Sequence, residues 1–197
     1  MRSLSEIETT SKRASRASGF SWGVSEEVGK SIRLLEMFNF KGIKNLNEYF
    51  KERSDKKFES PNLINESNNP KEFLYCPILL GVNFLDQINN LEKIKIINFS
   101  NIAYPLLFLP FLSKSSEVIG KKIHFKFDNY EYLMNINVNI ASNLISENCP
   151  NIAKNAKVIF IENKDNFHEQ DWKSLYQLSE QTFVEENESL KKGAAGA

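Results

Sequence analysis

The stretch Gly19-Phe20-Ser21-Trp22-Gly23 separates two segments whose apolar residues recur with helical spacing. Gly19 is placed to adopt the left-handed conformation that ends many helices. Ser21 can cap the following helix with its hydroxyl. Helices are therefore predicted over residues 4–17 and 22–37, the first of them opened by the capping box Ser3-x-x-Glu6. Two helices joined by so short a turn form an αα-hairpin.

The second predicted helix carries two lines of residues. An apolar stripe expected to face the core consists of Val24, Val28, Ile32 and Leu35. A second line, expected to face away from that stripe, consists of Trp22, Glu26, Gly29 and Arg33. A glycine inside a helix costs about 0.8–1 kcal/mol relative to alanine. Gly29 therefore suggests that another element packs closely there.

The turn between the two helices is the strongest candidate site. The start of the second helix offers free amide groups and a partial positive charge, and Lys12, Arg13 and Arg16 lie just before it. Such groups can hold a phosphate or a carboxylate, with Trp22 as a flat apolar wall. The predicted ligand-binding residues are Arg13, Arg16, Ser21, Trp22, Gly23, Glu26 and Arg33. The structural alternative has ordinary caps, a tryptophan packed in the core, and basic residues that offset the end of the first helix.

The rest of the chain predicts a sheet with flanking helices. Strands are expected over residues 73–80, 94–99 and 157–162, with a β-hairpin over 122–127 and 131–138. Helices are expected over 82–91, from the Pro105–Pro110 region to 118, and over 171–182. The predicted fold class is α/β (or α+β), in which the N-terminal helical hairpin packs on a mixed β-sheet.

One domain is expected for the 197 residues. Within it we distinguish a helical hairpin (1–38), a surface linker (39–72), an α/β core (73–190) and a flexible Gly/Ala tail (191–197). Inside the linker, Leu46, Tyr49 and Phe50 indicate a short amphipathic helix.

Composition limits the classes of partner and the cellular compartment expected for this protein. Lys+Arg 25 balance Asp+Glu 25, which argues against a nucleic-acid-binding protein that relies on bulk electrostatics. Two distant cysteines, Cys76 and Cys149, favour a reducing compartment. The longest apolar stretch, residues 102–112, contains two prolines and is shorter than the about 20 residues that span a bilayer. Without an N-terminal apolar segment, a cytoplasmic protein without nucleic-acid or membrane partners is expected.

Known catalytic motifs do not occur in this sequence. It lacks the glycine-rich dinucleotide fingerprint, the P-loop, the nucleophile elbow and the zinc-protease motif. His124 and His168 have no metal-ligand spacing, and Cys76 lies in an apolar run typical of an inert buried thiol. We therefore expect neither a metal nor a cofactor.

The segment from Gly19 to Gly29 resembles the N-terminal signature of a bacterial family classified as a domain of unknown function. That signature is Gly-aromatic-Ser-Trp-Gly, followed by two glutamates and a glycine. Further places of resemblance are Ser3-Leu4, Cys76-Pro77 with Gly81, Tyr104-Pro105-Leu106-Leu107 through Pro110-Phe111, and the Gly/Ala tail. Ser25 and Val28 stand where alanines are expected, and residues 51–70 depart from the family pattern. The resemblance implies that the tryptophan segment matters, and it implies no reaction.

Three functional hypotheses follow. The leading one is an accessory protein that binds a small anionic metabolite or a partner protein through the helical hairpin. The alternative is a metal-independent metabolic enzyme with Glu26 or Glu27 as general base and Arg13 or Arg16 as anion clamp. That enzyme would need a desolvated glutamate with a raised pKa in a concave pocket. The third is a homodimer in which Gly29 lets two helices cross, so that the second line is only an interface.

Overall fold

The structure is a computed structural model that describes residues 2–143 and 149–182. The chain forms two compact units, Met1–Asn163 and Lys164–Ala197. The first unit holds the sheet and its helices, and the second holds helix α7 (Glu169–Glu180). The predicted α/β core (73–190) extends across the division between these two units. The predicted Gly/Ala tail lies outside the described residues.

The N-terminal hairpin consists of α1 (Leu4–Ala17) and α2 (Trp22–Met37), which confirms both predicted helices. The Ser3 hydroxyl accepts a hydrogen bond from the Glu6 amide at 3.1 Å, and the Ser21 hydroxyl accepts one from Val24 at 3.3 Å. Gly19 has φ +92°, in the region that favours glycine. The turn therefore forms as its residues predict.

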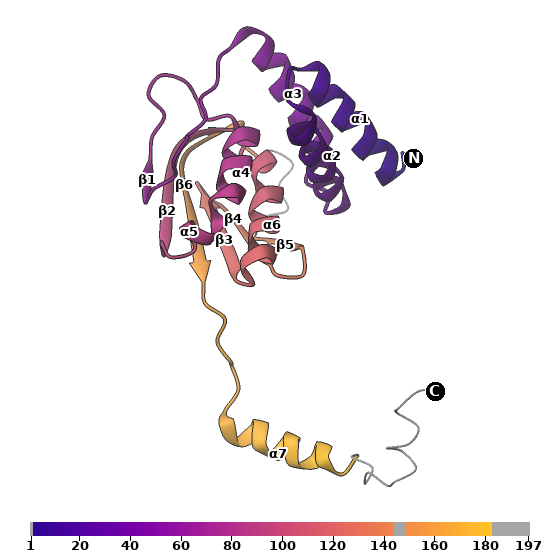
Figure 1. Cartoon of the computed structure of the whole chain (residues 1–197), viewed down its shortest axis with the longest axis vertical. Coiled ribbons are helices and arrows are strands. Elements are labelled where there is room, and N and C mark those ends of the chain that lie inside the picture. The colour runs from indigo at the N-terminus through magenta and orange to yellow at the C-terminus, as the bar shows by residue number, and fades with distance from the viewer. Residues whose placement is uncertain (1, 144–148, 183–197) are drawn as a thin grey trace, which may run out of the picture. The chain divides into compact units, whose positions relative to one another are not determined.

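A six-stranded mixed sheet follows, in the order β1-β2-β6-β3-β4-β5 (Figure 1). Its strands are β1 (Ser67–Asn68), β2 (Ile96–Ala103), β3 (Lys122–Phe127), β4 (Tyr130–Asn135), β5 (Asn139–Ser142) and β6 (Ile152–Ile161). Among the strands of the described residues, the short β1 pairs in parallel with β2 and the remaining strand pairs are antiparallel. The predicted strands near 94–99 and 157–162 and the predicted hairpin are confirmed.

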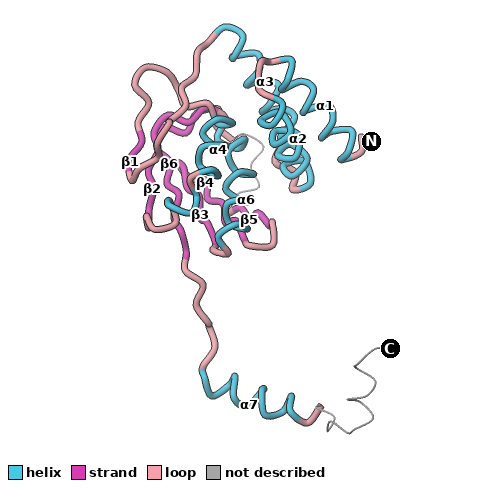
Figure 2. Tube along the Cα trace, viewed as in Figure 1, coloured by secondary structure: helices cyan, strands magenta, loops and turns pink. Residues whose placement is uncertain are grey.

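Helices cover one face of this sheet (Figure 2). They are α4 (Pro77–Asp86), α5 (Ile88–Leu91), the 3-10 turn η1 (Pro105–Phe108) and α6 (Leu109–Ile119). The buried Phe108 ring meets Phe84 and Phe125 edge to face, each at 5.6 Å between ring centroids. Alternate residues of the central strands point into this core because successive strand side chains face opposite sides.

The third helix, α3 (Gly42–Asp55), joins the hairpin to the sheet layer. Tyr49 packs edge to face on Tyr104, at 5.8 Å between centroids. The Tyr104 hydroxyl donates to the Glu52 carboxylate at 2.9 Å. From the segment before α3, Phe40 packs on Tyr132 of β4 at 5.7 Å. The helical hairpin thus packs on a mixed sheet with flanking helices, as the predicted fold class states.

Two sequence predictions differ from the structure. The strand predicted over 73–80 is wrong, because helix α4 begins at Pro77 behind a Cys76 cap whose sulfur accepts the Leu79 amide at 3.3 Å. The amphipathic helix predicted inside the linker is confirmed as α3, but the linker is not only surface, because it buries Leu46, Tyr49 and Ile64. Apolar residues at helical spacing inside a charged segment explain this burial.

Candidate functional site

The turn of the hairpin presents an exposed tryptophan. Trp22 is 62% exposed, and the Arg16 guanidinium carbon lies 5.3 Å from the centroid of its ring. Arg16 also donates to the Phe20 carbonyl at 2.8 Å, which fixes the guanidinium beside the ring. Gly23 faces open space. The interpretation that buries Trp22 in the core is therefore wrong, and Arg16, Ser21, Trp22 and Gly23 form one exposed corner.

Beyond Trp22, the second line of α2 faces α1. The Glu26 carboxylate accepts from Lys12 of α1 at 3.4 Å, and Arg33 donates to Glu8 of α1 at 3.0 Å. Gly29 is buried between these pairs, and a Cβ placed on it would lie 2.8 Å from the Glu8 carbonyl oxygen. Close packing within one chain thus accounts for Gly29, without a crossing between two copies.

Arg13 is exposed on α1. The α1 side chains that contact α2 are Glu8, Lys12 and Arg16, which recur at four-residue steps. Arg13 does not fit this spacing and lies off that line. Of the predicted residues, the structure thus brings four together at the corner, places Glu26 and Arg33 along the α1 contact, and leaves Arg13 on another part of the surface.

Both glutamates proposed as general bases are held in their charged form. Hydrogen bonds from Lys30 and Lys12 lower the pKa of Glu26. Burial raises the pKa of Glu27, but hydrogen bonds and charge from Lys114 and Lys30 outweigh burial and leave that pKa below its ordinary value. A general base near neutral pH is favoured by a raised carboxyl pKa. The environment of both side chains therefore disfavours that role.

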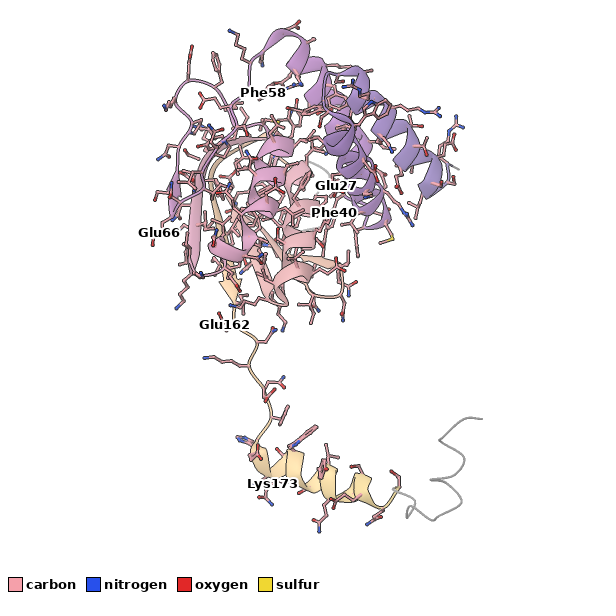
Figure 3. All side chains as sticks on the ribbon, viewed as in Figure 1. Glu27, Phe40, Phe58, Glu66, Glu162 and Lys173 are labelled. Atoms are coloured by element: carbon pink, nitrogen blue, oxygen red, sulfur yellow. The ribbon has the colours of Figure 1, made fainter. Side chains whose placement is uncertain are left out.

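A pocket of about 300 Å³ lies between the hairpin and α6, and we call it the charged pocket. Charged side chains that line it are Glu8, Glu27, Lys30, Arg33, Lys114 and Glu117. Its apolar surface comes mainly from Leu34, Met37, Pro110 and Phe111. Figure 3 labels Glu27, whose carboxylate accepts from Lys114 at 2.8 Å and from Lys30 at 3.2 Å.

Arg33 is the predicted site residue that lines the charged pocket. Glu27, named above as a possible general base, lines it as well, whereas the sequence did not identify its remaining polar residues as site residues. Glu27 and Lys30 lie one helical turn apart, a spacing that signals a pair. Lys114 lies 87 residues from Glu27, so no local pattern connects them.

The other residues with reactive side chains, Cys76 and His124, contact neighbouring side chains of the fold. Cys76 is buried, its sulfur lies 2.9 Å from the Tyr49 hydroxyl, and burial raises its pKa. His124 lies 3.1 Å from the Glu131 carboxylate. Within residues 2–143 and 149–182, no three His, Cys, Asp or Glu side chains are grouped to hold a metal ion. Over the same residues, no helix has the length and apolar character needed to cross a membrane.

The N-terminal part of the chain matches a known family. Residues 2–74 match the model of a family described as "Protein of unknown function (DUF3726)", which confirms the resemblance to a domain of unknown function over these residues, while the places of resemblance from Cys76 onward lie outside the match. The matched part includes α1, α2 and α3, with every predicted site residue. No curated protein and no solved structure matches the chain.

Proposed function

We propose that this protein is a cytoplasmic accessory component that binds a small carboxylate-bearing metabolite in the charged pocket. The observation that carries the proposal is the convergence of Lys30, Arg33 and Lys114 beside an apolar surface. Small-molecule sites commonly combine such a surface with a few polar groups that orient the ligand. The helical hairpin supplies most of the lining, in keeping with the function expected for it.

The cations retain capacity for a ligand. Glu8 accepts from one terminal nitrogen of Arg33, and a guanidinium has further N–H donors in a geometry that suits a carboxylate. Lys114 donates to Glu27, and an ammonium group has further donors. Phe111 and Leu34 can then receive the apolar part of the ligand.

The balance of charges narrows the ligand class. Each of the three cations pairs with a carboxylate of the same lining, Arg33 with Glu8 and both Lys30 and Lys114 with Glu27. Glu117 adds a third carboxylate to the lining. A ligand with only negative charge would meet these carboxylates without compensation. A ligand that bears both a carboxylate and an ammonium group can exchange partners with an existing ion pair and leave every charge paired. The lining therefore favours an amino acid with an apolar side chain.

Isothermal titration calorimetry with three matched compounds tests this proposal. L-phenylalanine carries both charges, 3-phenylpropionate lacks the ammonium group, and phenethylamine lacks the carboxylate. We expect the amino acid to bind at least about tenfold more tightly than either analogue. The full-length Arg33→Gln variant should lose about tenfold in affinity, whereas Arg13→Gln, which removes an arginine that lines no described pocket, should not. No heat from any compound up to about 10 mM, or equal loss in both variants, would refute the proposal.

A second candidate function is partner binding at the exposed corner. This candidate is supported by the exposed Trp22 ring, which lies beside the Arg16 guanidinium. Tryptophan and arginine are enriched among the residues that dominate protein interfaces. A second copy is the partner that can be tested directly, by light scattering across protein concentrations. A dimer that Trp22→Ala converts to monomer supports this candidate, and a wild-type monomer at every concentration refutes self-association there.

A further inference from the structure

A second pocket, of about 670 Å³, lies where α1 and α3 both end, and we call it the basic pocket. Its cations come from the end of α3 and the residues just after it, namely Arg53, Lys56 and Lys57. Ser18, which follows α1, lies on its other side. Figure 3 labels Phe58, which contributes one wall. Most of its lining residues, though not Ser18 and Phe73, therefore lie in the predicted linker.

The lining of the basic pocket has no carboxylate, in contrast to that of the charged pocket. Lys56 pairs with Glu52 at 3.2 Å. The Arg53 guanidinium lies 4.4 Å from the centroid of the Phe20 ring. Among the described residues, neither Arg53 nor Lys57 forms an ion pair. The pocket thus gathers three cations, of which Lys56 is paired with a carboxylate of the described residues and Arg53 and Lys57 are not.

A structural role explains only part of this charge. Cations near the C-terminus of a helix offset its partial negative charge, and Arg53 lies in the last turn of α3. Lys56 is accounted for by its pair with Glu52. Lys57 has no such role, since it lies beyond the helix end and is exposed. The convergence of three cations on one concave surface points instead to an anion.

The shape and lining indicate what the anion is attached to. Three half-buried rings, Phe50, Phe58 and Phe73, provide apolar surface next to the cations. Lys56, Lys57, Phe58 and Phe73 also line an adjoining pocket of about 640 Å³, where Lys71, Glu72 and Asn101 add hydrogen-bonding groups. A ligand can therefore place a highly charged end among the cations and extend a polar, partly aromatic body into the adjoining pocket.

We propose that the basic pocket binds the phosphoryl group of a phosphorylated aromatic metabolite of the nucleotide class. A phosphate monoester carries more negative charge at neutral pH than a carboxylate, so a lining with three cations and no carboxylate of its own favours it. Glu52 pairs with Lys56 from outside this lining, and Asp55 and Glu72 line only the adjoining pocket. The phenylalanine rings offer stacking or edge contact to a planar base. This site shares no lining residue with the charged pocket, and the proposal is independent of the function given above.

Calorimetric titration of the full-length protein with three probes tests the assignment. The probes are adenosine 5′-monophosphate, adenosine and inorganic phosphate. We expect the nucleotide to bind at least about tenfold more tightly than either part alone. Lys57→Gln should weaken nucleotide binding about five- to tenfold. Lys51→Gln is the matched control, because Lys51 is an exposed lysine of α3 that lines no described pocket.

Three results of these titrations would contradict the assignment of a phosphoryl group to the basic pocket. Equal affinity for nucleotide and adenosine removes the phosphoryl role of the pocket. Equal affinity of the Lys57→Gln and Lys51→Gln variants moves the binding site elsewhere and overturns the assignment. Absence of binding by every probe up to about 10 mM also overturns it. Arg33→Gln should leave nucleotide binding unchanged, which distinguishes failure at this pocket from failure at the charged pocket.

Discussion

Replacement of Gly29 by alanine tests the packing that explains the second line of α2. A Cβ at this position would lie 2.8 Å from the Glu8 carbonyl oxygen and 3.1 Å from the Lys12 Cβ. The first of these atoms belongs to the backbone of α1, so it cannot rotate away as the end of a side chain can. Gly29→Ala should therefore force α1 and α2 apart.

The expected loss of stability is the difference between two effects. Overpacking of a close contact costs about 1–3 kcal/mol. Alanine recovers about 0.8–1 kcal/mol of helix propensity relative to glycine. The net change is a loss of about 1 kcal/mol in the free energy of unfolding. For a chain of this length, that loss lowers the Tm by about 2–4 °C.

Gly23→Ala is the matched control, since nothing lies within 4 Å of a Cβ placed there. The same chemical change should then stabilise the protein by about 0.4–1 kcal/mol. Urea unfolding followed by circular dichroism should move the two midpoints in opposite directions. If Gly29→Ala stabilises the protein as much as Gly23→Ala does, the close approach of α1 to α2 is wrong.

Three further predictions concern exposure and titration. In a Trp172→Phe variant, the emission maximum should change little on unfolding in urea, because Trp22 is 62% exposed in the folded state; a large red shift contradicts this. In a Cys149→Ser variant, a thiol reagent at about pH 8 should modify Cys76 only as fast as the protein opens, because burial removes the thiol from solvent and raises its pKa; rapid modification contradicts this. Burial and, next, the charge of Lys126 lower the pKa of His124 despite Glu131, so its NMR titration midpoint should lie below 6.5. Between the lowered pKa of the folded state and pH 6.5, the unfolded state then binds more protons than the folded state. The contribution of His124 to the free energy of unfolding should therefore be fully present above pH 6.5 and fall as the pH drops through the folded pKa. Comparison with His124→Gln measures this contribution.

Local signals explain why the hairpin could be predicted from the sequence. Ser3, Gly19 and Ser21 each act within a few residues of their own position, and each takes the conformation or hydrogen bond expected of it. The apolar run at 73–80 is ambiguous, because short apolar runs suit a strand or a buried helix alike. A cap at Cys76 and a proline at the first helical position decide for the helix.

The pockets could not be predicted in this way, because their residues meet only in the folded chain. Lys114 reaches Glu27 from α6, and Phe73 reaches the end of α3 from beyond a long connecting segment. Charged residues between 51 and 57 were visible in the sequence, but solvated charge is common in surface segments. Their convergence depends on the burial of Tyr49 and Leu46, which anchors α3 against its neighbours.

The contact between α1 and the second line of α2 could have been predicted, because the matching residues of α1 were visible in the sequence. Arg16, Lys12 and Glu8 recur at four-residue steps on α1, and an antiparallel hairpin sets them against Trp22, Glu26 and Arg33 in that order. Periodicity shows that residues share a face, but the opposite charges of a neighbouring helix show what covers that face. The middle of the line is therefore an interface within the chain. Its two ends are not covered by α1 alone, since Trp22 lies at the exposed corner and Arg33 lines the charged pocket.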